Sequence, residues 1–451
     1  MQHNYFDTST TIIASATATG GAVMVVRLCG ERAIEIADAM FRGRQPLSVA
    51  KGYTLHYGTI VRTTGEVVDD VVAALFRAPH SYTGDDIVEF TLHGSEYITS
   101  EVIRLAIEHG AVMATPGEFT RRAFLAGKMD LSRAEAVADI ISSDSAWSHN
   151  VASTQMRGDY SNRLSALHDE LVRLCSLLEL ELDFSEEDVE FANRDTLNKL
   201  LQDIDDSVRE LKSSFAIGNV LKNGVSVAII GEPNAGKSTL LNTLIGDDCA
   251  MVSDIAGTTR DTIEATTTID GIRFRFVDTA GIRTTDDTLE QMGIERAMRA
   301  IERANIIVHV APVDNPKYDD ISIRDNQRYI RVINKIDTST SSKFEADNDT
   351  LTISAKYGDG IDELRAHLRS VVDTSQLSSG SVVVSNMRHY AALSDAAEAL
   401  NDARRAMRSG LPADLISEDI RRVIHHIGEI TGEITSDDIL HSIFSKFCIG
   451  K

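Results

Sequence analysis

Residues 225–238, VSVAIIGEPNAGKS, decide the fold class of this chain. They open with a short apolar run rich in β-branched residues, which is typical of a strand buried on both faces. The run leads directly into G-x-x-x-x-G-K-S, whose defining residues are Gly231, Gly236, Lys237 and Ser238. Glycines at this spacing let backbone N–H groups surround a phosphate chain, and the helix that follows directs its positive N-terminus at the same anion. The pattern predicts a phosphate-binding loop, with Lys237 on the outer phosphates and the Ser238 hydroxyl on Mg²⁺.

The length and composition of the chain limit its class. A chain of 451 residues exceeds one ordinary hydrophobic core, so we expect about two to four domains. The 43% hydrophobic and 25% charged residues are typical of a soluble globular protein. The four cysteines lack pair spacing, so neither a disulfide framework nor a zinc site is predicted. No Lys or Arg precedes Arg27 and no apolar run reaches membrane-spanning length, so we expect no signal peptide, no membrane segment and a cytoplasmic location.

The formal net charge of −23 limits how the chain meets nucleic acid. A protein that grips nucleic acid mainly through phosphates is locally basic. Any RNA contact must therefore come from a small basic patch or from a partner. Three arginine pairs are candidates for such a patch: Arg121 with Arg122, Arg404 with Arg405, and Arg421 with Arg422.

Residues 1–120 predict a β-rich α+β domain. Stretches 53–61, 67–76 and 87–93 are rich in β-branched and aromatic residues, and turn signals separate them. One helix is expected from a Ser95 cap to a stop at Gly110.

The pattern is helical over residues 121–217 and again over 376–451. Leucines at positions 164, 167, 171, 174 and 178 share one helix face. Residues 218–375 lie between the two helical stretches, so we expect a nucleotide-binding domain inserted into a helical domain, with junctions at 218–224 and 375–385. The acidic run 179–190 is interpreted as a solvated helix end or connection. The overall prediction is an α/β multidomain protein.

Three further motifs follow the phosphate loop, each at a strand end. A hairpin over 261–278 turns at Asp270-Gly271 and ends in DTAG at 278–281, where Asp278 can hold Mg²⁺ through water and the Gly281 N–H can meet a γ-phosphate. NKID at 334–337 follows a strand over 329–333, and SAK at 354–356 follows one over 351–353.

These motifs identify the nucleotide. The Asp337 carboxylate can accept two hydrogen bonds from guanine, at N1–H and the exocyclic amine, and adenine offers no such pair. We therefore predict GTP, bound at the strand ends of an open, mostly parallel sheet. Ile282 follows DTAG, where a glutamine often orients the attacking water, and Ile282 cannot do so. Another group must supply that role and the positive charge needed in the transition state.

The whole chain resembles the MnmE (TrmE) family of bacterial tRNA-modification GTPases. The resemblance rests on the GTPase motifs and on four further segments: APHSYTGDDIVE (78–89), PGEFTRRAFLAGKMDL (116–131), AMVSDIAGTTRD (250–261) and GEITSDDILHSIFSKFCIGK (432–451). It implies an N-terminal folate-binding and dimerisation domain, an all-α helical domain, and an inserted Ras-like P-loop GTPase domain.

The resemblance also implies which groups orient the attacking water and supply the positive charge. Asn234, Ser253, Ile255 and Thr258 would hold a K⁺ ion when two GTPase domains dimerise, and Thr259 would join Ser238 on Mg²⁺. Glu290 would orient the water, so that the implied catalytic residues are Glu290, Asn234 and Gly281. The GTP-binding residues would be Asn234, Ala235, Gly236, Lys237, Ser238, Thr239, Ser253, Asp254, Ile255, Ala256, Gly257, Thr258, Thr259, Asp278, Thr279, Ala280, Gly281, Asn334, Lys335, Asp337, Ser354, Ala355 and Lys356.

The N-terminal region is similar to the folate-binding domains of aminomethyl transferases. This likeness implies that Arg27, Glu89, Lys128 and Lys451 line a site for a formyl- or methylene-tetrahydrofolate. The family usually carries a Pro-Gly-Arg-Gly-Gly-like loop near the N-terminus; residues 16–22 here read ATATGGA and lack its arginine.

The implied function is K⁺-dependent GTP hydrolysis coupled to tRNA modification. A homodimer would pair with the FAD-dependent protein MnmG in a heterotetramer, with FAD on the partner alone. Together they would add an aminomethyl or carboxymethylaminomethyl group to carbon 5 of the wobble uridine, without DNA or a membrane, and glycine and ammonium stay open as nitrogen donors. The alternative is a ribosome-assembly or regulatory GTPase, which predicts an RNA-binding module of the GXXG kind that this sequence does not display. Cys448 and the pair His425-His426 are interpreted as an inert thiol and as helix surface.

Overall fold

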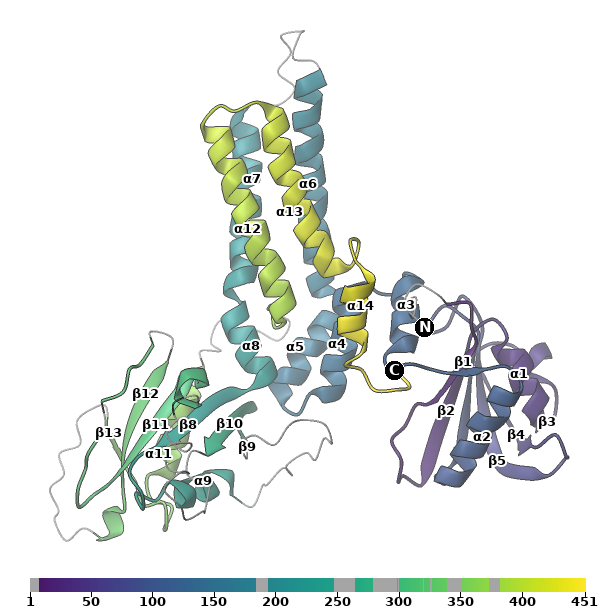
Figure 1. The fold of residues 1–451 in the computed structure, drawn as a ribbon, viewed down its shortest axis with the longest axis horizontal. Coiled ribbons are helices and arrows are strands. Elements are labelled where there is room, and N and C mark those ends of the chain that lie inside the picture. The colour runs from purple at the N-terminus through teal and green to yellow at the C-terminus, as the bar shows by residue number, and fades with distance from the viewer. Residues whose placement is uncertain are drawn as a thin grey trace, which may run out of the picture. The chain divides into compact units, whose positions relative to one another are not determined.

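In the computed structural model, the described residues are 8–183, 194–246, 264–278, 298, 300–318, 320–324, 327–338, 350–372 and 382–451. Figure 1 labels their helices and strands, which belong to two compact units. Unit 1 comprises Met1–Ala138, Gln155–Leu197 and Ala399–Lys451, and unit 2 comprises Asp139–Thr154 and Asn198–Glu398. This division into two units does not test the four domain ranges expected from the sequence, which stay a prediction.

Unit 1 contains a seven-stranded sheet with the strand order β3-β4-β5-β6-β2-β1-β7. The paired strands are antiparallel except β1 and β7, which run parallel. The three strands expected from the sequence are confirmed as β4, β5 and β6. The strands are β1 (Ile12–Ser15), β2 (Val23–Cys29), β3 (Phe41–Gly43), β4 (Thr54–Val61), β5 (Val67–Phe76), β6 (Ile87–His93) and β7 (Val112–Met113).

Two helices and one 3-10 turn complete the core of this sheet: α1 (Ala33–Met40), α2 (Glu96–Glu108) and η1 (Leu47–Val49). Buried side chains of α1 and α2, such as Ile36 and Leu105, join those of the strands in one apolar cluster. Burial of each such side chain stabilises the fold by about 1.5–3 kcal/mol. The expected Ser95 cap is confirmed, because the Ser95 hydroxyl accepts a hydrogen bond from the Ile98 N–H.

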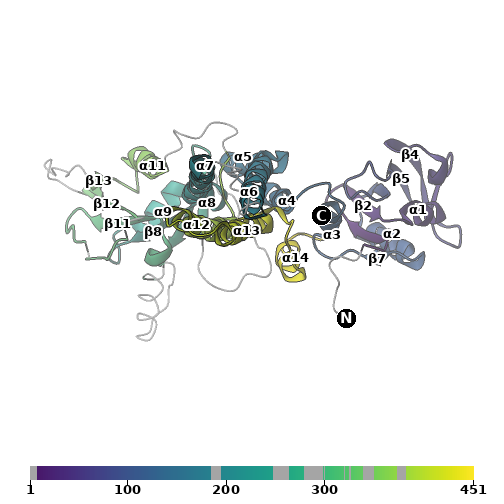
Figure 2. The same ribbon diagram turned by 90° about the horizontal axis from the view of Figure 1, so that it is seen from above.

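The remaining helices of unit 1 are α3 (Glu118–Leu125), α4 (Leu131–Ser142, whose end lies in unit 2), α6 (Asp159–Asp183), α13 (Ala413–Thr431) and α14 (Asp437–Phe444). Helices α6 and α13 lie side by side (Figure 2). The five leucines predicted to share one face of α6 are all buried, which confirms the helical spacing. The acidic run begins on α6, which ends at Asp183, and its residues 184–190 lie outside the described residues.

Unit 2 contains a six-stranded sheet with the order β13-β12-β11-β8-β10-β9. Among the described strands, β9 alone runs antiparallel to its neighbour, so the predicted mostly parallel sheet is confirmed. The β9–β10 hairpin turns at Asp270-Gly271, as predicted. The strands are β8 (Val225–Ile230), β9 (Glu264–Ile269), β10 (Ile272–Asp278), β11 (Ile306–Pro312), β12 (Arg328–Asn334) and β13 (Thr350–Thr352).

The helices with most of their residues in unit 2 are α5 (Ala146–Arg157), α7 (Arg194–Ser213), α8 (Phe215–Asn223), α9 (Lys237–Ile245), α11 (Ile361–Ser370) and α12 (Met387–Arg408), with the short η2 (Ile336–Thr338). Val151 of α5 and Leu221 of α8 enter the apolar core of the sheet. None of the helices in the described part of the chain is long and apolar enough to span a membrane.

The expected junction at 218–224 is helix α8 up to its last residue, Asn223. Gly218 is a packing position rather than a linker residue, because a Cβ there would lie 2.2 Å from the Val384 carbonyl oxygen. Gly224 ends the helix with a φ of +79°, a conformation that favours glycine. The second expected junction, at 375–385, lies largely outside the described residues.

Candidate functional site

The phosphate-binding loop follows β8 and leads into α9. Its two defining glycines have φ values of +141° at Gly231 and +98° at Gly236. A Cβ at Gly231 would lie 2.0 Å from the Val310 carbonyl oxygen, and one at Gly236 would lie 2.2 Å from Asn334 Nδ2. Both positions therefore require glycine for conformation and for space.

Lys237 begins α9, and its ammonium group turns back over the loop. The Nζ atom donates hydrogen bonds to the carbonyl oxygens of Gly231 at 2.8 Å and of Glu232 at 2.9 Å. Asn234, within the same loop, has a left-handed φ of +65°. The loop thus carries a cation and several backbone N–H groups at the start of a helix, which is the arrangement that binds a phosphate chain.

Asn334 connects the phosphate-binding loop to both guanine motifs. Its side-chain Nδ2 donates to the Ala235 carbonyl oxygen at 2.9 Å. Its Oδ1 accepts from the backbone N–H groups of Lys335 at 2.8 Å and of Ala355 at 3.0 Å. The residue is only 2% exposed. One buried amide therefore fixes the loops that follow β8, β12 and β13 relative to one another.

The predicted guanine-binding carboxylate is oriented by the SAK motif. The Ser354 hydroxyl donates to Asp337 Oδ1 at 2.7 Å, while Asp337 itself is exposed. Thr243 of α9 donates from its hydroxyl to the Ala355 carbonyl oxygen at 2.7 Å. The Lys356 ammonium lies over the Tyr357 ring, 5.0 Å from its centroid. The carboxylate is thus held by one oxygen at the open edge of the strand ends.

The other described residues predicted for GTP take up consistent backbone positions. Ser238 and Thr239 form the first turn of α9. Asp278 is the last residue of β10 and pairs with Ile229 of β8, the strand that precedes the loop. The remaining predicted residues lie outside the described residues: Ser253, Asp254, Ile255, Ala256, Gly257, Thr258, Thr259, Thr279, Ala280, Gly281 and Glu290, together with Ile282.

Three of the four predicted folate residues come together in unit 1. Arg27 and Glu89 are register partners on β2 and β6, and Arg27 Nε lies 2.7 Å from Glu89 Oε1. The chain around Lys451 reaches the same place, because the Gly450 carbonyl oxygen accepts from Arg27 Nη1 at 3.5 Å and the Lys451 carbonyl oxygen accepts from the Phe119 N–H at 3.2 Å. The fourth residue, Lys128, donates from its ammonium group to the Pro79 carbonyl oxygen.

Two aromatic residues that sequence reasoning did not single out flank Arg27. The guanidinium carbon lies 5.4 Å from the ring centroid of Phe119 and 5.8 Å from that of Tyr82. Both residues belong to segments that carry the family resemblance, and their aromatic character was the available signal. Cys448 is exposed, and its carbonyl oxygen accepts from the Gly117 N–H at 3.4 Å.

Of the three arginine pairs considered for an RNA contact, Arg121 with Arg122 is excluded. The two residues are 6% and 1% exposed. Arg122 donates to Glu118 at 2.9 Å and to the Thr10 carbonyl oxygen at 2.7 Å. These contacts make the pair part of the core of unit 1. Three residues of the other pairs are exposed and lie beside acids: Arg405 beside Asp402, Arg421 beside Glu179 and Arg422 beside Asp419.

The fold and this site define a P-loop GTPase class of protein. The family model described as "MnmE helical domain" matches residues 131–448, and "GTP-binding protein TrmE N-terminus" matches residues 11–128. The chain is 46% identical to the tRNA modification GTPase MnmE of Bacteroides fragilis, over 98% of this chain and 99% of that protein. It is 45% identical to that of Christiangramia forsetii, again over 98% and 99%. A solved structure of Aquifex aeolicus Era is 27% identical over 38% of this chain and 65% of that one, with a TM-score of 0.25. The chain belongs to the MnmE (TrmE) family.

Proposed function

We propose that this chain hydrolyses GTP as part of tRNA modification. The relatives that it matches over nearly its full length are named tRNA modification GTPases. The observation that carries the nucleotide part is the buried Asn334 amide, which joins the phosphate-binding loop to the motif of Asp337 and to the motif of Ser354.

In this proposal each part of the loop has a separate task. Backbone N–H groups of the loop and Lys237 bind the phosphates, and Asp337 accepts hydrogen bonds from the guanine edge. Ser238 and Thr259 are the proposed Mg²⁺ ligands, since hydroxyl oxygens are hard donors that suit this ion, and Asp278 would hold the ion through a water molecule. The ion, when bound, neutralises the negative charge that develops on the phosphate oxygens.

We further propose that hydrolysis depends on K⁺. Ile282 follows DTAG and cannot orient water, so the chain needs another source of positive charge. Asn234, with its left-handed backbone in the loop, is the described member of the proposed ligand set. The other members are Ser253, Ile255 and Thr258, so all four supply neutral oxygen donors. Glu290 is proposed to position the water and the Gly281 N–H to meet the γ-phosphate.

The proposal for unit 1 is a tetrahydrofolate site at Arg27, Glu89, Lys128 and Lys451. A carboxylate suits the amide-like edge of a pterin, and the cations suit the glutamate tail. The aromatic rings of Tyr82 and Phe119 beside Arg27 add apolar surface to this polar set. The bound folate would supply the one-carbon unit.

The proposed assembly is a cytoplasmic homodimer that pairs with an FAD-dependent protein of the MnmG kind. Its product would be wobble uridine that carries an aminomethyl or carboxymethylaminomethyl group at carbon 5. The proposed domains are a folate-binding domain at 1–120, a helical domain at 121–217 and 376–451, and an inserted GTPase domain at 218–375. The pairing with a partner is compatible with the acidic net charge of −23, because the partner can carry most of the tRNA contact.

Two measurements test the proposal. GTP turnover should be at least about 10-fold faster in KCl than in NaCl, because the proposed K⁺ ion stabilises the negative charge of the transition state. Asn234→Ala should remove the difference, because it removes a proposed ligand of that ion. Equal rates in the two salts would contradict the K⁺ requirement.

Loss of the gene should remove the modified wobble uridines from tRNA, measured by mass spectrometry of nucleosides. Unchanged wobble uridines would contradict the role in tRNA.

A further inference from the structure

A polar cavity of about 460 Å³ lies at the amino-terminal ends of strands β8, β10 and β11 in unit 2. The phosphate-binding loop and the guanine motifs follow the carboxyl ends of the parallel strands, so this cavity is at the opposite edge of the same sheet. Its walls are the end of α4, the start of α5 and the end of α8, which leads directly into β8 (Figure 1). The volume is within the range of small-ligand sites.

The cavity gathers positive charge in an acidic chain. Four cations line it, namely Lys222, Arg273, Arg275 and Arg303, and Asp139 is the single acid among its described lining residues. This local excess stands against a formal net charge of −23 for the whole chain. A cavity with low-dielectric walls and one sign of charge concentrates ions of the opposite sign.

The ion pairs at the cavity hold two of these cations in place. Lys222 Nζ lies 2.7 Å from Asp139 Oδ2, and Arg273 Nη1 lies 2.5 Å from Asp144 Oδ2. The Nε of Arg273 is buried and has no hydrogen-bond partner among the described residues. Such a donor on a cation is costly to leave unsatisfied, so it favours an acceptor ligand.

The neutral lining also suits an anion. Four further lining residues, Ser142, Ser143, Asn219 and Asn223, carry hydroxyl or amide groups. None of the described lining residues is aromatic, so the cavity offers no ring on which a base could stack. Two lining residues are held together by a hydrogen bond, because Asn305 Oδ1 accepts from the Ser226 N–H at 2.9 Å. The lining thus matches a phosphate group rather than a nucleobase.

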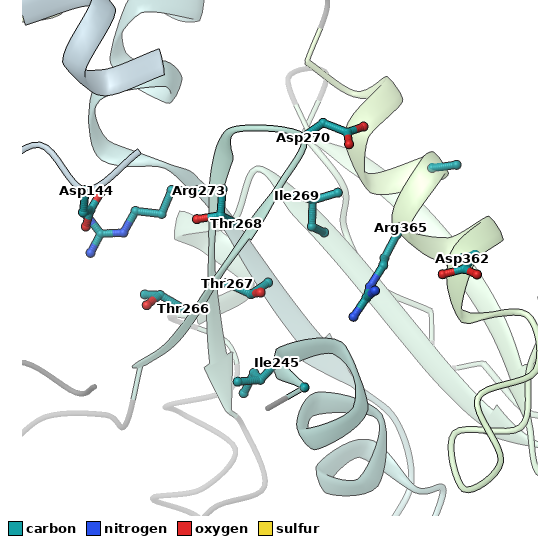
Figure 3. A pocket seen from close by; sticks show the side chains of 12 residues that line it. Asp144, Ile245, Thr266, Thr267, Thr268, Ile269, Asp270, Arg273, Asp362 and Arg365 are labelled. Carbon is teal, nitrogen blue, oxygen red and sulfur yellow. The ribbon is translucent and has the colours of Figure 1, made fainter. Parts of the chain in front are cut away.

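A second cavity in unit 2 has a different character. Its volume is about 760 Å³, and it lies between β9, the end of α9 and α11 (Figure 3). Three acids there, Asp144, Asp270 and Asp362, outnumber the two cations Arg273 and Arg365. Arg273 lines both cavities, and Figure 3 shows its side chain directed at Asp144. The charge balance there does not favour an anion.

We propose that the 460 Å³ cavity binds a phosphate group. The preferred source is a backbone phosphate of RNA, and that choice rests on the proposed function in tRNA modification. A free phosphate-bearing small molecule offers the same chemistry, and the test separates the two sources. The site is distinct from the GTP phosphates, which belong to the opposite edge of the sheet.

The test compares the full-length protein with Arg303→Gln and with the double variant Arg275→Gln/Arg303→Gln. The matched control is Arg328→Gln, an exposed arginine of unit 2 that does not line the cavity. All proteins are saturated with GDP, and binding is measured for fluorescently labelled bulk tRNA by anisotropy and for inorganic pyrophosphate by calorimetry. Arg303 lies at the exposed rim, so its single variant keeps the test usable if the double variant folds poorly.

We expect the double variant to bind tRNA at least about 10-fold more weakly and to lower the slope of log K against log salt by about 1 to 2, since two of the four cations that line the cavity are removed. The control should bind as the unaltered protein does, and GTP turnover should be unchanged in all. If only pyrophosphate binding is lost, the source is a free phosphate-bearing molecule. If both probes bind the double variant as before, the site does not exist. Wobble-uridine analysis of the same variants in cells is independent, so failure here is separable from failure of the proposed function.

Discussion

The side-chain Nδ2 of Asn334 donates a hydrogen bond to the Ala235 carbonyl oxygen at 2.9 Å, which ties the end of β12 to the phosphate-binding loop. The same side chain accepts two backbone hydrogen bonds through Oδ1. A single residue therefore transmits the position of the guanine motifs to the phosphate cradle. Because it is buried, loss of either half of its hydrogen bonding leaves polar groups without water.

Asn334→Asp and Asn334→Ala separate the hydrogen bond that Nδ2 donates from the two that Oδ1 accepts. The aspartate keeps both accepted bonds but loses the donated bond and places an oxygen against the Ala235 carbonyl. The alanine loses all three. If the link to the loop controls nucleotide binding, both variants should bind GDP at least about 10-fold more weakly, equivalent to about 1.4 kcal/mol, by calorimetry. Retention of full affinity by Asn334→Asp would show that anchoring of the SAK motif is sufficient.

Gly236→Ala should abolish nucleotide binding while the sheet stays folded. Its Cβ would lie 2.2 Å from Asn334 Nδ2, so either the loop or the asparagine must move. Gly65→Ala is the control, because its φ of +89° is close to that of Gly236 and no atom lies within 4 Å of the new Cβ. GDP titration of both variants is the measurement. If Gly236→Ala binds GDP as tightly as the control does, glycine is not required at position 236.

The segment around Gly450 should be needed for the proposed folate site but not for GTP. A Cβ at Gly450 would lie 2.0 Å from the Ser15 carbonyl oxygen, and its φ is +98°. We therefore expect Gly450→Ala to move the segment away from Arg27 and to weaken binding of 5-formyltetrahydrofolate at least about 10-fold, measured by calorimetry.

Gly410→Ala is the control for this variant, because its φ of +69° is also left-handed but no atom lies within 4 Å of the new Cβ. GTP turnover should be the same in both variants. Unchanged folate binding by Gly450→Ala would separate the segment from the site.

Local patterns in the sequence predicted the elements that depend on local physics. The β-branched runs became β4, β5, β6 and β8, and the leucine spacing became the buried face of α6. The order of motifs placed Asn334, Asp337 and Ser354 at neighbouring strand ends, where the hydrogen bonds now unite them. In these cases the signal lies within a few residues of the structure that it forms.

The features that sequence reasoning missed depend on contacts far along the chain. Gly218 resembled a linker residue because its close neighbour, Val384, is distant in sequence. Arg121 and Arg122 resembled a basic surface because the Thr10 carbonyl that holds Arg122 is likewise distant. The proposed roles of Glu290 and Thr259 rest on family resemblance, since they lie outside the described residues.

Glu118 and Arg122 form a buried ion pair, in which Arg122 Nη2 lies 2.9 Å from Glu118 Oε1. Burial raises the pKa of Glu118, but hydrogen bonds from the Thr115 N–H and from Arg122 outweigh it and hold the pKa below its ordinary value. Glu118→Gln leaves the Arg122 charge, 1% exposed, without its closest carboxylate, at a cost of about 3 kcal/mol. Hydrogen exchange of peptides from 116–131 should then become about 100-fold faster at pH 7.

The stabilisation that the Glu118 carboxylate provides should decrease as the pH falls. A carboxyl group whose pKa is lowered by folding stabilises the fold above its unfolded pKa, near 4.5, and this contribution is lost as the pH falls through the folded value. The difference in exchange between the unaltered protein and Glu118→Gln should therefore shrink below pH 4.5. Glu35→Gln, which removes the partner of exposed Arg32, should leave exchange unchanged, since surface pairs contribute little. A constant difference from pH 7 to pH 3 would show that packing, rather than the carboxylate charge, sets the role of Glu118.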